Sequence, residues 1–180
     1  MGANVTHFLF LTALMLQMAA CHTAKQPLTI NELKNREYRS EWSSKGKIKL
    51  SDGIYQEKIA PDSATELVVR LTDKIAFGDL NGDGVEDAAL ILLSDPGGSG
   101  TFYDLAAVIN REGKAKYAAS VFLGDRVKVE EINIRSGQIV VQMVIHHRTD
   151  PRCCPSLRVE QEYGLQGDEL LRQSLMERPQ

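Results

Sequence analysis

The chain has 180 residues, of which 43% are hydrophobic and 25% are charged. This composition is typical of one globular domain and excludes wholesale disorder. The 24 acidic residues outnumber the 21 basic ones, which gives a formal net charge of -3. Because nucleic-acid binding depends on a basic surface, this balance argues against a nucleic-acid partner.

The first twenty residues have the pattern of an export signal. An apolar run over residues 8–16 is followed by small residues up to Ala20, which is typical of a signal peptide. A bilayer core of about 30 Å needs roughly 20 apolar residues in a helix, so this run is too short for a permanent transmembrane segment. We therefore expect residues 1–20 to be removed.

Cys21 follows the expected cleavage point directly. The Met18-Ala19-Ala20-Cys21 segment resembles the bacterial lipobox, in which the cysteine is acylated and becomes the first residue of the mature protein. Ordinary secretory cleavage is the alternative, but it leaves a cysteine at this position unexplained. The sequence thus predicts a lipoprotein of the bacterial cell envelope. Its lipid on Cys21 would anchor it to a membrane, on the periplasmic or extracellular side.

A short polar tether and one helix are expected next. Residues 21–27 have the composition of a tether. Thr29 and Glu32 then have the spacing of a capping box, in which each side chain accepts a hydrogen bond from the backbone amide of the other residue. The sequence predicts a helix that starts at Thr29 and ends at about Tyr38 or Ser40.

From residue 47 onward, short β-prone segments alternate with turn residues. The expected strands cover residues 47–50, 54–59, 66–71, 75–78, 88–93, 102–110, 117–122, 127–135, 138–145, 157–165 and 169–171. Turns such as Asp52-Gly53 and Ser136-Gly137 separate them too closely for helical crossovers, so hairpins are favoured. We expect a single β-rich domain over residues 28–180, of the α+β class. Its sheet should be mainly antiparallel, with one short N-terminal helix.

The hydrophobic pattern also predicts which strands are central. Segments 88–93 and 105–109 are apolar throughout, so they should be buried on both faces and covered by a helix or a second sheet. Segment 157–165 alternates apolar and polar residues, as in a strand with one face in water. Between Val129 and Ile132 the apolar phase shifts by one residue, which predicts a β-bulge.

Oxygen-bearing side chains recur at alternate positions in the loop before the first central strand. The predicted ligands are Asp79, Asn81, Asp83, the carbonyl oxygen of Val85, and Asp87. Such hard oxygen ligands suit calcium. An EF-hand is a poor interpretation, because Leu90 stands where a bidentate glutamate is required and both flanks are strand-like. The alternative is an ion-free hairpin turn.

If Cys21 is acylated, Cys153 and Cys154 are the two remaining cysteines. Neighbouring α-carbons are about 3.8 Å apart, less than in ordinary disulfides, so a bond between them would be strained and easily reduced. Export to an oxidising compartment still makes this bond reasonable. The alternative is metal handling, with zinc or copper held by the pair and by His146 or His147. Neighbouring strand residues point to opposite faces, so at most one histidine could join.

Signals for an enzyme are weak, and we expect a protein without catalytic activity. The glycine-rich segment 97–101 lacks the Lys-Ser/Thr ending of a phosphate loop and the last glycine of a nucleophile elbow. The unassigned carboxylates of Asp95, Asp104 and Asp125 leave an envelope hydrolase as a further alternative. A deep polar cleft would favour that alternative.

Several separated motifs resemble known families. Phe77-Gly78 and the acidic loop after it are similar to the calcium loops of integrin-type FG-GAP repeats, although a motif that occurs once implies no propeller. Together with segments 97–103 and 123–127 and with Cys153-Cys154-Pro155-Ser156, they resemble bacterial envelope lipoproteins of the LppP/LprE-like kind. The resemblance implies a location but no reaction. The expected role is a calcium-stabilised binding or structural module with an envelope protein as its partner.

Overall fold

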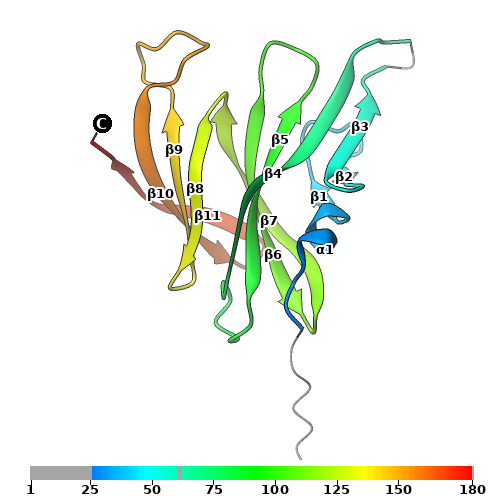
Figure 1. Cartoon of the computed structure of the whole chain (residues 1–180). Coiled ribbons are helices and arrows are strands. Elements are labelled where there is room, and N and C mark those ends of the chain that lie inside the picture. Colours follow the sequence, from blue (N-terminus) through cyan, green and yellow to red (C-terminus); the bar gives the residue numbers. More distant parts are fainter. Residues whose placement is uncertain (1–25, 61, 180) are drawn as a thin grey trace, which may run out of the picture.

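The computed structural model describes residues 26–60 and 62–179, in which two large antiparallel sheets pack against each other (Figure 1). The predicted signal peptide and Cys21 lie outside the described residues. The elements in chain order are α1 (Ile30–Lys34), β1 (Glu37–Arg39), β2 (Lys47–Lys49), β3 (Ile54–Lys58), β4 (Glu66–Gly78), β5 (Asp87–Asp95), β6 (Phe102–Arg111), β7 (Lys114–Asp125), β8 (Lys128–Arg135), β9 (Gln138–Ile145), β10 (Leu157–Gln166) and β11 (Glu169–Glu177).

A five-stranded sheet forms the middle layer, in the order β3-β4-β5-β6-β7. The four-stranded sheet β11-β10-β9-β8 covers one of its faces, and α1 with the β1-β2 pair covers the other. All neighbouring strands pair antiparallel, which confirms the predicted fold class. Among the described residues, no helix is both long and apolar enough to cross a membrane.

The central strands are buried on both faces, as the sequence predicts. Ala89 and Ile91 of β5 belong to the core between the two large sheets. Leu90 and Leu92 of the same strand belong to a second core under α1, β1 and β2. Because successive strand residues point to opposite faces, one apolar strand contributes to two cores at once.

Two strand predictions have different outcomes. The β-bulge is confirmed, because the register between β8 and β9 shifts between Val129 and Glu131. The prediction of separate strands at residues 66–71 and 75–78 is wrong, because β4 is continuous across them and pairs with β5 on both sides of an irregularity between Leu71 and Ile75. The polar residues of that irregularity resemble a turn in the sequence.

The helix is confirmed at its start but is shorter than predicted. The Thr29 hydroxyl oxygen accepts a hydrogen bond from the Glu32 amide at 3.2 Å, and the Glu32 carboxylate accepts one from the Thr29 amide at 2.9 Å. The helix ends at Lys34, because residues 37–39 pair with β2 instead. Tyr38 points into the core with 1% of its surface exposed. Strand pairing and burial of this ring therefore override the local helical tendency.

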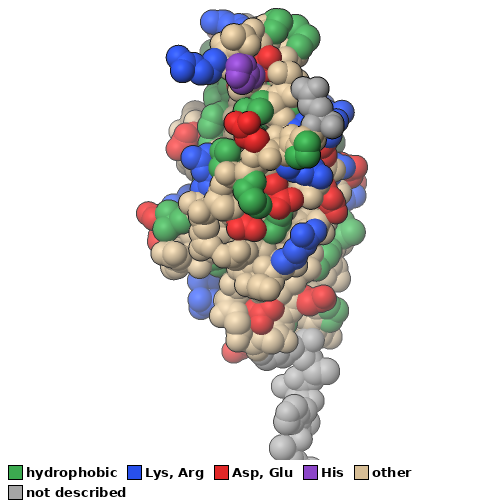
Figure 2. All heavy atoms as spheres, turned by 90° about the vertical axis from the view of Figure 1, so that its left-hand side faces the viewer, with side chains coloured by type: hydrophobic (Ala, Val, Ile, Leu, Met, Phe, Trp, Pro, Cys, Tyr) green, Lys and Arg blue, Asp and Glu red, His purple; other side chains and the backbone are tan. Residues whose placement is uncertain are grey.

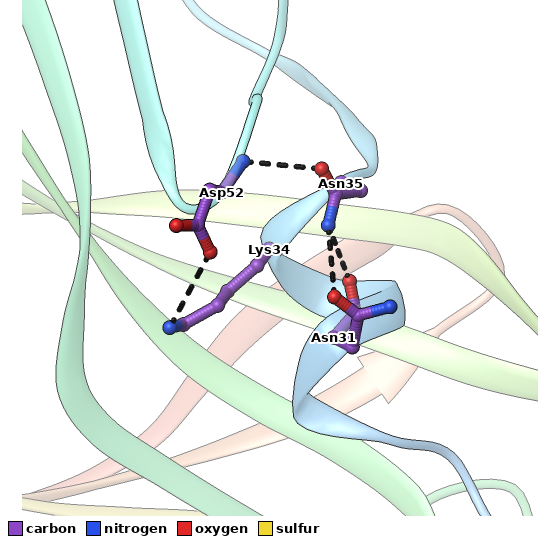
Figure 3. A network of polar contacts seen from close by, with 4 residues as sticks. All are labelled: Asn31, Lys34, Asn35 and Asp52. Carbon is purple, nitrogen blue, oxygen red and sulfur yellow. Dashed lines mark hydrogen bonds and ion pairs between the residues drawn. The ribbon is translucent and has the colours of Figure 1, made fainter.

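The end of α1 is joined to the β2-β3 turn (Figure 3). The Asp52 amide donates to the Asn35 side-chain oxygen at 3.1 Å, and the Lys34 ammonium lies 3.7 Å from the Asp52 carboxylate. The Gly53 amide donates to the Lys34 carbonyl at 2.8 Å, so a free carbonyl at the helix end gains a partner. These contacts fix a one-turn helix that would not be stable alone.

We predict that truncating the buried side of α1 destabilises the whole domain. Leu33 has no exposed surface, so Leu33→Ala should lower the free energy of unfolding by about 2–5 kcal/mol in urea titrations. Ile30 is a matched control in the same helix, because 51% of it is exposed. Ile30→Ala should change stability by about 0.5 kcal/mol or less. Equal effects of the two variants would show that α1 does not cover the second core.

Candidate functional site

The predicted calcium loop connects β4 to β5 and is organised by side-chain hydrogen bonds to its own backbone. The Asp79 carboxylate accepts from the amides of Asn81 at 3.2 Å, Gly82 at 2.7 Å and Gly84 at 2.8 Å. These bonds hold the pKa of Asp79 below its ordinary value, that of Gly84 having the largest effect. Gly82 and Gly84 have φ angles of 77° and 75°, which other residues rarely adopt.

Asp87, at the end of this loop, is a buried carboxylate with two backbone partners. Its oxygens accept hydrogen bonds from the amides of Leu80 at 2.9 Å and Asn110 at 2.8 Å. Burial raises the pKa of Asp87, the two amide bonds oppose this, and the charges of Asp83 and Asp79 raise the pKa further. The carboxylate thus joins the loop to the end of β6 and lies in the field of two other aspartates.

Asn110 extends this connection to the N-terminal segment. Its side-chain amide donates to the Gln26 carbonyl at 2.8 Å, and its side-chain oxygen accepts from the Gly113 amide at 2.9 Å. The chain therefore enters the domain beside the acidic loop. Figure 1 shows this end of the sheets opposite the end that carries the β9-β10 loop.

The side-chain oxygens of the loop are of the type that binds calcium. In the structure, however, they accept hydrogen bonds from backbone amides of the same loop. The Asp83 carboxylate accepts from the Val85 amide at 2.8 Å, and the Asn81 side-chain oxygen accepts from the Asp83 amide at 2.9 Å. Across residues 26–60 and 62–179, no group of three or more acidic, histidine or cysteine side chains is arranged to hold a metal ion. Carboxylate and amide oxygens remain suitable calcium ligands, so calcium binding here stays a prediction.

The two cysteines lie in the β9-β10 loop, where a disulfide joins Cys153 to Cys154 with their α-carbons 3.7 Å apart. With the sulfur atoms bonded to each other, this arrangement does not favour the metal-handling alternative. Asp150 organises the loop, because its carboxylate accepts from the His147 amide at 2.8 Å and from the Ser156 amide and hydroxyl at 2.8 and 2.7 Å. The hydrogen bonds from Ser156 and His147 lower the pKa of Asp150.

The three unassigned carboxylates have different surroundings. Asp95 accepts a hydrogen bond from the Gly97 amide at 2.9 Å. Asp125 accepts one from the Thr101 amide at 3.1 Å and pairs with Arg126. Both therefore serve local loop structure. Asp104 instead lies on the wall of a cavity next to β1.

No family model, curated protein or solved structure matches this chain. The likeness to LppP/LprE-like lipoproteins and to FG-GAP loops therefore stays a prediction, and function has to be argued from the geometry above.

We predict that Asp87 is required for stability whether or not calcium is present. Asp87→Ala would leave the buried amides of Leu80 and Asn110 without partners. Each unpaired amide should lower the free energy of unfolding by about 1–3 kcal/mol. Urea titrations in the presence of a chelator should therefore show a free energy of unfolding about 3 kcal/mol lower than that of the wild type. Asp83→Ala, in the exposed part of the same loop, should cost much less under the same conditions. A loss for Asp83→Ala as large as for Asp87→Ala would contradict this role.

Proposed function

We propose that the protein is a lipoprotein of the bacterial cell envelope, anchored to a membrane through lipid on Cys21. The observation that carries this proposal is the apolar run over residues 8–16 followed by Met18-Ala19-Ala20-Cys21. If Cys21 carries the lipid, the domain starts five residues after the anchor, because Gln26 is already bonded to Asn110. At about 3.3–3.6 Å per residue, a fully extended tether would reach at most roughly 17 Å.

The short tether would restrict how the domain is oriented relative to the membrane. It would hold the end of the domain that carries the β4-β5 loop close to the membrane. The β9-β10 loop with its disulfide would face away from the membrane, because it lies at the opposite end of the sheets (Figure 1). We propose that the domain works there as a binding or structural module without catalytic activity.

An envelope protein is the partner class that we propose for this module. The side of the molecule near β9 and β10 intersperses acidic, basic and hydrophobic side chains (Figure 2). Such a mixed surface is compatible with protein contacts, whose overall composition is close to that of ordinary protein surface, and it differs from the single-sign basic surface that nucleic acids require.

We propose further that calcium stabilises the β4-β5 loop. Support comes from the charges of Asp79 and Asp83, which raise the pKa of the buried Asp87. A cation among these groups would offset their mutual repulsion. Since Asp87 contacts the end of β6 and Asn110 contacts Gln26, stabilising this loop would also stabilise the entry of the chain into the domain.

Replacing Cys21 tests the anchor. Cys21→Ala should abolish acylation and move the protein from the membrane fraction to the soluble fraction, because the predicted lipid provides the attachment. Cell fractionation with immunoblotting measures the shift, and intact mass should show lipid on the wild type. The double variant Cys153→Ser, Cys154→Ser is the matched control and should stay with the membrane. Recovery of unlipidated mature wild type from the soluble fraction would overturn the proposal.

Thermal unfolding in calcium and in chelator tests the loop. Extracellular calcium modules bind with dissociation constants of about 10⁻⁴ to 10⁻³ M. Calcium at 100 times that constant would add about 2.7 kcal/mol to the free energy of unfolding, which corresponds to a rise in Tm of about 5–10 °C. Asp83→Ala should remove the rise. Asp73→Ala, an exposed aspartate on β4, should keep it.

Absence of a calcium effect on the melting curve would contradict the proposal for the loop. Identical wild-type melting curves in calcium and in chelator would show that the loop is an ion-free polar turn. The anchor would be unaffected by that result, because it depends on Cys21 alone.

A further inference from the structure

A cavity of about 270 Å³ with both polar and aromatic lining residues lies where the β1-β2 pair meets the central sheet. Its volume is close to the lower end of the range of about 300–1,000 Å³ for small-molecule sites. Asp104, on its wall, is six residues along β6 from Asn110, or roughly 20 Å. The cavity is therefore separate from the β4-β5 loop, and a ligand bound in it would require neither calcium nor the lipid anchor.

The charged residues of the wall come from all three layers and are mainly acidic. Glu41 is in the β1-β2 connection, Asp104 is on β6, and Asp168 is in the β10-β11 turn. Arg39 of β1 is the basic residue on the same wall. Three carboxylates against one guanidinium give the wall a negative charge when all are ionised, which favours a cationic ligand.

Two aromatic side chains line the cavity, and two more lie next to one of them. Phe122 lines the cavity with 52% of its surface exposed, and Tyr117 lines it from the same strand. Trp42 stacks on Phe102 with ring centroids 3.9 Å apart and lies 6.4 Å from Phe122. Exposed aromatic faces attract cations that carry apolar groups, and they offer contacts for the apolar part of such a ligand.

The connection that carries Glu41 and Trp42 is held in place by β3. The Glu57 carboxylate accepts hydrogen bonds from the hydroxyls of Ser43 at 2.7 Å and Ser44 at 2.6 Å. The β7 side of the cavity is fixed as well, because the Tyr117 and Ser120 hydroxyls lie 2.8 Å apart in a hydrogen bond. The walls are thus preformed, which lowers the entropic cost of binding.

We propose that this cavity binds a small organic ammonium ion, with Asp104 as the main carboxylate partner and Phe122 and Tyr117 in contact with its apolar part. Within the described part of the chain, the acidic side chains do not gather as a metal site. Carboxylates spread over three elements fit an elongated organic cation better than a compact metal ion.

The proposed site should respond to pH. Burial, and next the charge of Glu41, raise the pKa of Asp104 to about 6, and a hydrogen bond with Trp42 opposes this. The other charged or titratable groups on the wall are Arg39, Tyr117 and Asp168. Since the ionised carboxylate is the form that attracts an ammonium ion, affinity should fall as the pH falls through about 6.

The test is a titration of the full chain with butylammonium and with 1-butanol, its neutral counterpart of similar size. Trp42 is the one tryptophan of the chain, so its fluorescence reports on the cavity, with calorimetry as a second measurement. At about pH 7.5 butylammonium should bind with a dissociation constant on the order of 1 mM, and 1-butanol should bind at least about tenfold more weakly.

Variants and pH complete the experiment. Asp104→Asn should weaken butylammonium binding at least about tenfold, while Asp73→Asn leaves it unchanged. Lowering the pH to about 5 should weaken wild-type binding by roughly tenfold, because only about a tenth of Asp104 would remain ionised. Circular dichroism of each variant establishes that it is folded. The proposal is overturned by equal binding of 1-butanol, by undiminished binding to folded Asp104→Asn, by displacement of butylammonium by calcium, or by no wild-type response.

Discussion

Burial of β5 and β6 on both faces is the constraint on which the rest of the structure depends. These strands have no polar face, so the middle sheet is stable only if each side is covered. The four-stranded sheet covers one side with a continuous surface. On the other side the cover is one helical turn and two three-residue strands. Residues 30–49, which hold α1, β1 and β2, are therefore a structural part of the domain.

The buried carboxylate of Asp87 joins this constraint to the acidic loop. It satisfies one amide of the loop and one at the end of β6, and the next side chain in the network reaches Gln26. A charged group is tolerated at this position because both of its oxygens have backbone donors. The loop, the central sheet and the N-terminal segment are thus connected through two side chains, so a ligand at the loop would act on the fold beyond the loop itself.

Local patterns in the sequence are sufficient to predict the antiparallel class, the two buried strands and the bulge at Val129. They are insufficient where a distant partner decides the outcome. Tyr38 belongs to a strand because β2 pairs with it and the core accepts its ring. Asp150 organises the disulfide loop, and the one local signal for this role is that Asp-Pro favours a turn. Asp104 stands out in the sequence only as an unassigned carboxylate, because Glu41 and Asp168 lie more than sixty residues away from it.

The position of the cavity follows from the unequal cover of the two faces. A one-turn helix and two short strands cannot fill the whole face of a five-stranded sheet, and where they end a gap is left beside β6 and β7. The gap leaves Asp104 half-buried on a face whose next residues inward, Ala106 and Val108, are fully buried. The turn after β10 closes the gap from the other sheet. A cation bound there would contact all three layers, and would stabilise the face on which the cover is thinnest.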